Sequence, residues 1–117
     1  MTQIDNVVFS YGFAMLSDAQ LKTDVVELDN ALGAIAGLRG VRFSWVDEAS
    51  GGPASGAATG QRQIGVLAQE VATVLPEIVH TNAAGMISVD YGKLAAVLVQ
   101  AVKELERRVA ILERKAG

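Results

Sequence analysis

The most regular alternation of apolar and polar positions lies at the C-terminal end of the chain. Between residues 91 and 115, apolar side chains recur at alternating spacings of three and four residues, the heptad pattern of a helix that packs against a partner helix. A helix of this length would extend roughly 37 Å at about 1.5 Å per residue, past the edge of a compact domain of this size. The pattern therefore predicts a long C-terminal helix with an apolar stripe, here called the seam, made of Ala95, Leu98, Val102, Leu105, Val109 and Leu112.

Two interpretations of the seam are open at this point. With Ala95, Val102 and Val109 at heptad position a, Arg108 falls at g and Glu113 at e. These opposite charges can meet between parallel neighbouring chains. Alternatively, the helix lies across the sheet of its own chain, because Val97, Val99 and Ile111 widen the apolar face beyond a strict seam. Valine at a with leucine at d favours two strands in isolated parallel coils, so the periodicity predicts self-association but does not establish a trimer.

Two shorter helices are predicted upstream. Residues 24–38 carry apolar side chains at spacings of three and four, although Gly33 inside this stretch costs about 1 kcal/mol relative to alanine. Residues 68–75 show the same helical spacing and are followed by Pro76, which cannot continue a helix. The chain is therefore expected to form two short helices before the long one.

Strand patterns separate these helices. Residues 41–45 alternate apolar and polar side chains, which predicts a strand with one buried face and places Trp45 in the core. Residues 78–81 and 86–90 flank a four-residue link in which Gly85 can take a positive φ, as in a hairpin. The predicted fold class is α+β, with a small, mostly antiparallel sheet, short helices and a long C-terminal helix that forms a parallel coiled coil.

Length and composition describe one globular domain. The chain has 117 residues, of which 50% are hydrophobic and 20% charged, well away from the composition of disordered chains. Residues 47–63 are rich in glycine, alanine and serine, and are predicted to form a surface loop. Residues 7–9 form a short β-prone run near the N-terminal end.

Composition also excludes several classes of function. The net charge is −3 and no basic block is present, so nucleic acid is not an expected partner. The absence of cysteine excludes disulfides, thiol chemistry and cysteine-ligated zinc, and one histidine cannot supply a multi-histidine metal site, so no metal or cofactor is expected. The longest apolar run, residues 94–99, is far shorter than the roughly 20 residues that cross a bilayer, so no membrane partner is expected either.

Few residues remain that could carry chemistry. His80 has no triad partner evident in the sequence and is interpreted as a core or surface histidine. Glu70 and Glu77 lie seven positions apart across a proline and are not expected to form a glycosidase-type carboxylate pair. Ser17 is followed three residues later by Gln20, the spacing of a capping box, so on composition alone a helix cap is the favoured interpretation of Ser17.

Four sequence blocks, however, resemble a known family. They are residues 17–22 (SDAQLK), 65–71 (GVLAQEV), 75–79 (LPEIV) and 88–94 (SVDYGKL), the last running into 101–105 (AVKEL). In this order, with the strand that ends in Trp45 between the first two, the chain resembles the self-cleaving C-terminal intramolecular chaperone domain of bacteriophage tail spikes, endosialidases and neck appendages. One departure is Gln20, where the family commonly has arginine, and this puts a local salt bridge in doubt.

The resemblance implies a module that brings three chains of a β-rich fibre together and is then released by autoproteolysis. Ser17 matches the family's nucleophile and Lys22, five residues later, its general base, which makes the chain a single-turnover serine peptidase with a Ser-Lys dyad. The family pattern points to the bond between Ser17 and Asp18, whereas attack on the preceding carbonyl would cut between Leu16 and Ser17. Residues 1–17 are then a leader that ends the upstream fibre, and residues 18–117 are the chaperone domain with its coiled-coil helix.

The implied partners are two further copies of the chain and the upstream fibre domain of the same polypeptide. The implied location is a virion tail spike or fibre precursor assembled in the host cytoplasm, and a bacterial surface protein is the alternative. Two other functions stay open: a non-cleaving trimeric cap or adhesin foot of the same fold, in which Ser17 only caps a helix, and an unrelated α+β domain that binds a small ligand.

The implied chemistry is physically reasonable. Serine needs a nearby base to become a nucleophile, and lysine can be that base where burial or a positive neighbourhood leaves it uncharged. If Ser17 begins a helix, the helix N-terminus would disfavour a charged Lys22 and could stabilise an oxyanion. Burial on assembly would then switch the lysine, so that cleavage reports correct trimerisation.

Overall fold

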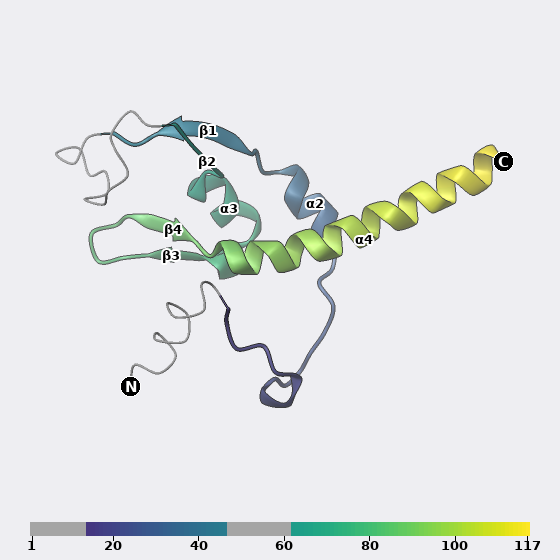
Figure 1. Cartoon of the computed structure of the whole chain (residues 1–117), viewed down its shortest axis with the longest axis horizontal. Coiled ribbons are helices and arrows are strands. Elements are labelled where there is room, and N and C mark those ends of the chain that lie inside the picture. The colour runs from purple at the N-terminus through teal and green to yellow at the C-terminus, as the bar shows by residue number, and fades with distance from the viewer. Residues whose placement is uncertain (1–13, 47–61) are drawn as a thin grey trace.

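The computed structural model describes residues 14–46 and 62–117. It confirms the α+β fold class, with short helices, small antiparallel sheets and one long C-terminal helix (Figure 1). Within these described residues the strands form two separate two-stranded sheets rather than one. The elements are η1 (Ala19–Leu21), α2 (Ala31–Ala36), β1 (Val41–Ser44), β2 (Arg62–Gly65), α3 (Ala68–Val74), η3 (Pro76–Ile78), β3 (Val79–Thr81), β4 (Ile87–Val89) and α4 (Tyr91–Ala116).

The long helix α4 forms where the heptad pattern predicts it. Asp90 caps its start, since the carboxylate accepts a hydrogen bond from the Lys93 main-chain nitrogen at 3.1 Å. Arg114 and Lys115 stand in its last turn, where positive charge complements the helix dipole. The first half of α4 lies against the body and the second half projects beyond it (Figure 1). The projecting half is why the chain extends 58 Å along its longest axis.

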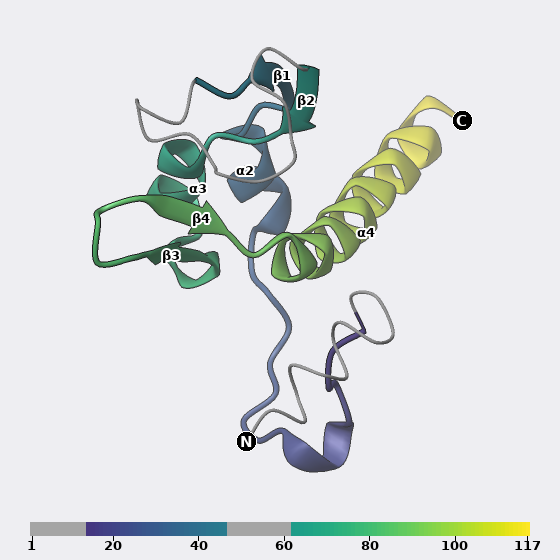
Figure 2. The ribbon, with the colours of Figure 1, turned by 60° about the vertical axis from the view of Figure 1, so that its left-hand side comes forward.

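The core lies where the first half of α4 meets the short helices. Helices α2 and α4 pack together on one side of the core, and α3 and η3 cover its other side (Figure 2). Val71 on α3 is fully buried at its centre. The other buried apolar side chains of the core cluster, among the described residues, are Ala31, Leu75, Ile78, Leu94, Val97 and Ala101.

The predicted helix over residues 24–38 is wrong in its first half, because α2 spans only Ala31–Ala36. Asp24 and Asn30 have φ values of 53° and 54°, and a right-handed helix cannot continue through such residues. Asn30 instead caps α2, accepting a hydrogen bond from the Gly33 nitrogen at 3.3 Å. Its side chain occupies the space that a Cβ atom at position 33 would need, which explains the glycine inside this helix.

The residues that precede α2 form an exposed segment, here called the arm (residues 14–30). Both views show the arm running away from the body of the domain (Figures 1 and 2). Along its length every residue is exposed. The exposed apolar side chains of the arm are Met15, Leu16, Leu21, Val25, Val26 and Leu28.

The β1–β2 hairpin confirms the predicted strand but not the burial of Trp45. Val41 pairs with Gly65 and Ser44 with Arg62, so two residues assigned to the loop, 62 and 63, belong to β2. Trp45 follows the strand and is 39% exposed, with its ring edge-on to Phe43 at a centroid distance of 5.0 Å. The alternation failed as a guide to burial because β1 contributes no residue to the core cluster. Residues 47–61 of the predicted loop, and the β-prone run at 7–9, lie outside the described residues.

The second hairpin and the helix before it form as predicted. Strand β3 pairs antiparallel with β4, and Gly85 takes a φ of 85° in the link between them. Asn82 organises this link, because its side-chain oxygen accepts hydrogen bonds from the nitrogens of Ala84 and Met86 at 2.9 and 3.0 Å. Helix α3 ends at Val74, immediately before the Leu75 to Pro76 step that the sequence marks as a stop.

Candidate functional site

The arm brings Ser17 and Lys22 into direct contact. Lys22 Nζ donates a hydrogen bond to Ser17 Oγ at 2.7 Å. The two residues flank η1, a single 3₁₀ turn, and the chain is extended again at Lys22. The pair that the family resemblance singled out is therefore within hydrogen-bond reach, which is the first geometric requirement of a nucleophile and its base.

The interpretation of Ser17 as a helix cap is wrong. The cap of the turn is Asp18, whose Oδ1 accepts a hydrogen bond from the Gln20 nitrogen at 2.9 Å. Ser17 Oγ therefore does not cap the turn and is hydrogen-bonded to Lys22 Nζ instead. No helix follows either, since η1 has three residues, so the suggested help from a helix dipole has no structural basis.

Ser17 and Lys22 are both exposed in the single chain. Met15 of the arm lies beside Gly92 at the start of α4, and Gln100 Nε2 of α4 donates a hydrogen bond to Glu27 Oε1 at 3.0 Å. Base catalysis at this contact requires the serine hydroxyl to transfer its proton to an uncharged amine.

The structure separates the two apolar faces of α4. Leu94, Val97 and Ala101 are buried against α2 and the core, so the helix packs in its own chain on helix α2 and not across a sheet. The seam lies on other positions and stays open in the single chain: Val102 is 63% exposed and Leu112 also 63%. Of the residues that widen the apolar face, Val97 is buried, whereas Val99 and Ile111 are exposed.

Glu104 is a polar residue that the sequence analysis missed. From α4 it reaches the start of α2, where its two carboxylate oxygens accept hydrogen bonds from the Leu32 and Ala31 nitrogens, each at 2.9 Å. These hydrogen bonds, with smaller contributions from Arg107 and Arg108, hold the pKa of Glu104 below its ordinary value of 4.5. No local signal could have revealed this contact, because the partners are 72 and 73 positions apart.

The other candidate residues do not join the pair in the arm. Glu70 forms a salt bridge with Arg39, at 2.7 Å between Nη2 and Oε2. His80 is exposed and lies opposite Ser88 on the β3–β4 hairpin. Within residues 14–46 and 62–117, no three acidic or histidine side chains lie close enough together to hold a metal ion. In the same part of the chain, no helix is both long and apolar enough to cross a membrane.

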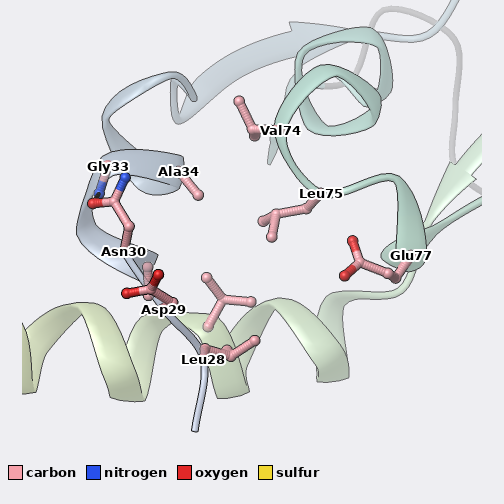
Figure 3. A pocket seen from close by; sticks show the side chains of 10 residues that line it. Leu28, Asp29, Asn30, Gly33, Ala34, Val74, Leu75 and Glu77 are labelled. Atoms are coloured by element: carbon pink, nitrogen blue, oxygen red, sulfur yellow. Dashed lines mark hydrogen bonds between the residues drawn. The ribbon is translucent and has the colours of Figure 1, made fainter.

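A groove of about 510 Å³ lies between α2, η3 and α4 (Figure 3). Leu28 and Asp29 line it from the arm, and Leu75 and Glu77 line it from the other side. Ser17 and Lys22 are not among its lining residues, and none of the described residues that line it carries a positive charge. The groove therefore offers neither the hydroxyl and amine of the arm nor a cationic partner for an anionic ligand.

A comparison with known protein families identifies a match. The model of a peptidase family described as "Chaperone of endosialidase" matches residues 17–80, more than half of the chain. The match begins at Ser17 and ends in β3, so the Ser17–Lys22 pair lies inside it and α4 outside. No curated protein matches the chain.

Proposed function

Because the chain belongs to the chaperone of endosialidase family, we propose that it is a trimerisation chaperone of a phage tail spike or fibre that releases itself by serine autoproteolysis. Membership confirms the family resemblance, and the matched residues 17–80 contain the first three of the four sequence blocks. The observation that carries the proposed cleavage is the 2.7 Å hydrogen bond between Lys22 Nζ and Ser17 Oγ, which forms at the residue where the family match begins.

In the proposed reaction Ser17 is the nucleophile and Lys22 the general base. The Ser17 hydroxyl gives its proton to an uncharged Lys22 amine while Oγ bonds to the carbonyl carbon of the scissile peptide. The tetrahedral intermediate then collapses, the peptide C–N bond breaks, and the leaving nitrogen takes the proton from Lys22. Water hydrolyses the ester left on Ser17, so the reaction needs no cofactor and each chain reacts once.

The position of the cut decides which chain supplies the hydroxyl. The family pattern points to the bond between Ser17 and Asp18, but attack by Ser17 on its own carbonyl would close a strained four-membered ring. A cut there requires the hydroxyl of a neighbouring chain in the assembly. A cut between Leu16 and Ser17 instead lets Ser17 attack the preceding carbonyl of its own chain through a five-membered ring, with the advantage of intramolecular geometry.

The seam is the proposed trimer contact. Its six side chains repeat at heptad spacing, and they remain exposed after α4 has packed against its own chain. Projection of the second half of α4 beyond the body leaves this stripe accessible to parallel copies (Figure 1). Across such an interface Arg108 of one chain would face Glu113 of the next. Association through α4 would also set the register of the fibre chains upstream of residue 17.

Assembly is the proposed trigger of cleavage. In the single chain both members of the pair are exposed to water. Neighbouring chains that cover the arm would remove water from Lys22 and disfavour its charged form. Loss of residues 18–117 after the cut would make unfolding of the mature fibre effectively one-way, because the chaperone can no longer assist refolding.

The test uses the natural chain, with its upstream fibre, as wild type, Ser17→Ala and Lys22→Ala. Denaturing gels and intact mass should show a released fragment in wild type and one full-length chain in both variants. The mass of the fragment identifies the bond. A wild-type assembly of three chains that stays at full length would contradict the proposed autoproteolysis, and would leave the non-cleaving trimeric cap as the function.

A second comparison tests the role of the seam. Leu105→Asp places a charge in the seam, whereas Ala110→Asp places one at an exposed position of α4 outside it. Light scattering should return a single-chain mass for Leu105→Asp and an unchanged trimer mass for Ala110→Asp, and only the former should lose cleavage. Normal cleavage by a single-chain Leu105→Asp variant would contradict assembly as the trigger. A single-chain mass for wild type would contradict the proposed trimer.

A further inference from the structure

We propose that Asp18 is the positioning residue of the Ser17–Lys22 pair: its carboxylate builds the turn that brings the amine to the hydroxyl, within each chain and before assembly. This inference rests on the proposed autoproteolysis and adds a residue and a step to it. The arm of each chain sets the geometry of the pair, and the neighbouring chains remove water from it.

Regular backbone conformations would keep the two side chains apart. In an extended chain, residues five apart stand about 17 Å from each other, farther than a lysine and a serine side chain together can span. In an α-helix, residues five apart point in directions that differ by about 140°, so they do not face each other. A contact at this spacing therefore requires a tight turn followed by extended backbone.

The structure contains that combination. The Leu21 nitrogen donates to the Asp18 carbonyl at 3.0 Å, and the Lys22 nitrogen donates to the Ala19 carbonyl at 3.1 Å. Before the turn Asp18 is extended, with φ −65° and ψ 124°, and after it Lys22 is extended again, with φ −111° and ψ 149°. The turn reverses the chain just enough for Lys22 Nζ to reach Ser17 Oγ at 2.7 Å.

A turn of three residues has few main-chain hydrogen bonds of its own, and in this turn a side chain accepts one more. Asp18 Oδ1 accepts from the Gln20 nitrogen at 2.9 Å and satisfies a donor that the short turn leaves without a main-chain partner. The bond joins residues two apart, so it can form in an isolated chain. The carboxylate acts through the backbone and is not itself placed on the reacting atoms.

The test compares three variants of the full chain with its natural fibre. Asp18→Ala removes the acceptor. Asp18→Asn keeps an oxygen that can accept from the Gln20 nitrogen but removes the charge. Gln20→Ala keeps the main-chain donor and is the matched control within the same turn.

The readout is the first-order cleavage rate in the assembled trimer, followed across pH. Asp18→Ala should cleave roughly two- to thirtyfold more slowly, the range expected when a cap is lost. Asp18→Asn should cleave faster than Asp18→Ala, and Gln20→Ala should stay near wild type. The trimer mass and the pH at which the rate reaches half its maximum should not change in Asp18→Ala. Loss of the turn lowers the fraction of chains in which Lys22 contacts Ser17, and it leaves the lysine side chain as it was.

Two results would overturn the inference: wild-type rates for Asp18→Ala, or an equal defect in Asp18→Ala and Asp18→Asn, which would mean that the charge and not the cap is needed. Ser17→Ala is assayed in parallel to separate this failure from that of the proposed function. If Ser17→Ala is still cut, the autoproteolysis itself is wrong. If Ser17→Ala is not cut while Asp18→Ala cleaves normally, only the positioning role of Asp18 is wrong.

Discussion

Gly65 is expected to tolerate no side chain, because the start of α4 lies directly against it. A Cβ atom at this position would stand 2.7 Å from Tyr91 Oη and 3.2 Å from Phe43 Cε1. The Tyr91 hydroxyl also accepts a hydrogen bond from the Val66 nitrogen at 3.2 Å, so it cannot move away without losing that contact. This close approach holds the β1–β2 hairpin against the first residue of α4.

The overlap at position 65 should lower the free energy of unfolding of Gly65→Ala by about 1–3 kcal/mol, the cost of overpacking of this kind. Tyr91→Phe removes the clashing oxygen and leaves the ring carbon Cζ 3.8 Å away, an ordinary contact, at a cost of about 1 kcal/mol for the lost hydrogen bond. In the Tyr91→Phe background, Gly65→Ala should therefore cost about 1–2 kcal/mol less than in wild type, since only the Phe43 contact remains tight.

Urea unfolding at one fixed protein concentration measures these energies, in a Ser17→Ala background so that no chain is cut. Gly40→Ala is the control, because a Cβ atom there would meet nothing within 4 Å. A cost for Gly65→Ala no larger than that of the control would refute the reasoning. So would strictly additive costs of Gly65→Ala and Tyr91→Phe, which would mean that the two side chains do not compete for the same space.

Three further predictions concern stability. The hydrogen bonds to Glu104 lower its pKa in the folded chain, so its contribution to stability is complete above its ordinary pKa of 4.5 and is lost as the pH falls below that value. Between about pH 6 and about pH 3, the free energy of unfolding measured with urea should therefore decrease less steeply for Glu104→Gln than for the unsubstituted chain, and an equal slope would contradict this. Val71→Ala at the fully buried centre should cost about 2 kcal/mol in the same assay, whereas Val99→Ala on the exposed face should cost less than about 0.5 kcal/mol. Gly85→Ala should cost about 1–2 kcal/mol because its φ is 85°, and a thermal midpoint equal to that of wild type would be the contrary result.

Local pattern was sufficient for the elements whose cause is local. The heptad spacing predicted α4 almost to the residue, and Gly85 marked the link of the β3–β4 hairpin. Ser17 and Lys22 were found from a short motif, and the turn that joins them is made by residues inside that motif. In each case the backbone conformation depends on side chains a few positions away, which a single sequence displays.

Tertiary structure decided the rest. The helical spacing over residues 24–38 could not reveal that Asn30 adopts a left-handed conformation and starts α2 there. Alternation in β1 could not reveal that the strand lies outside the core, which leaves Trp45 exposed. Which face of α4 packs in its own chain depends on where α2 lies, and the link from Glu104 to α2 joins residues 73 positions apart. Such contacts have no local signature, because burial and long-range hydrogen bonds depend on which elements meet in space and not on the period within any one of them.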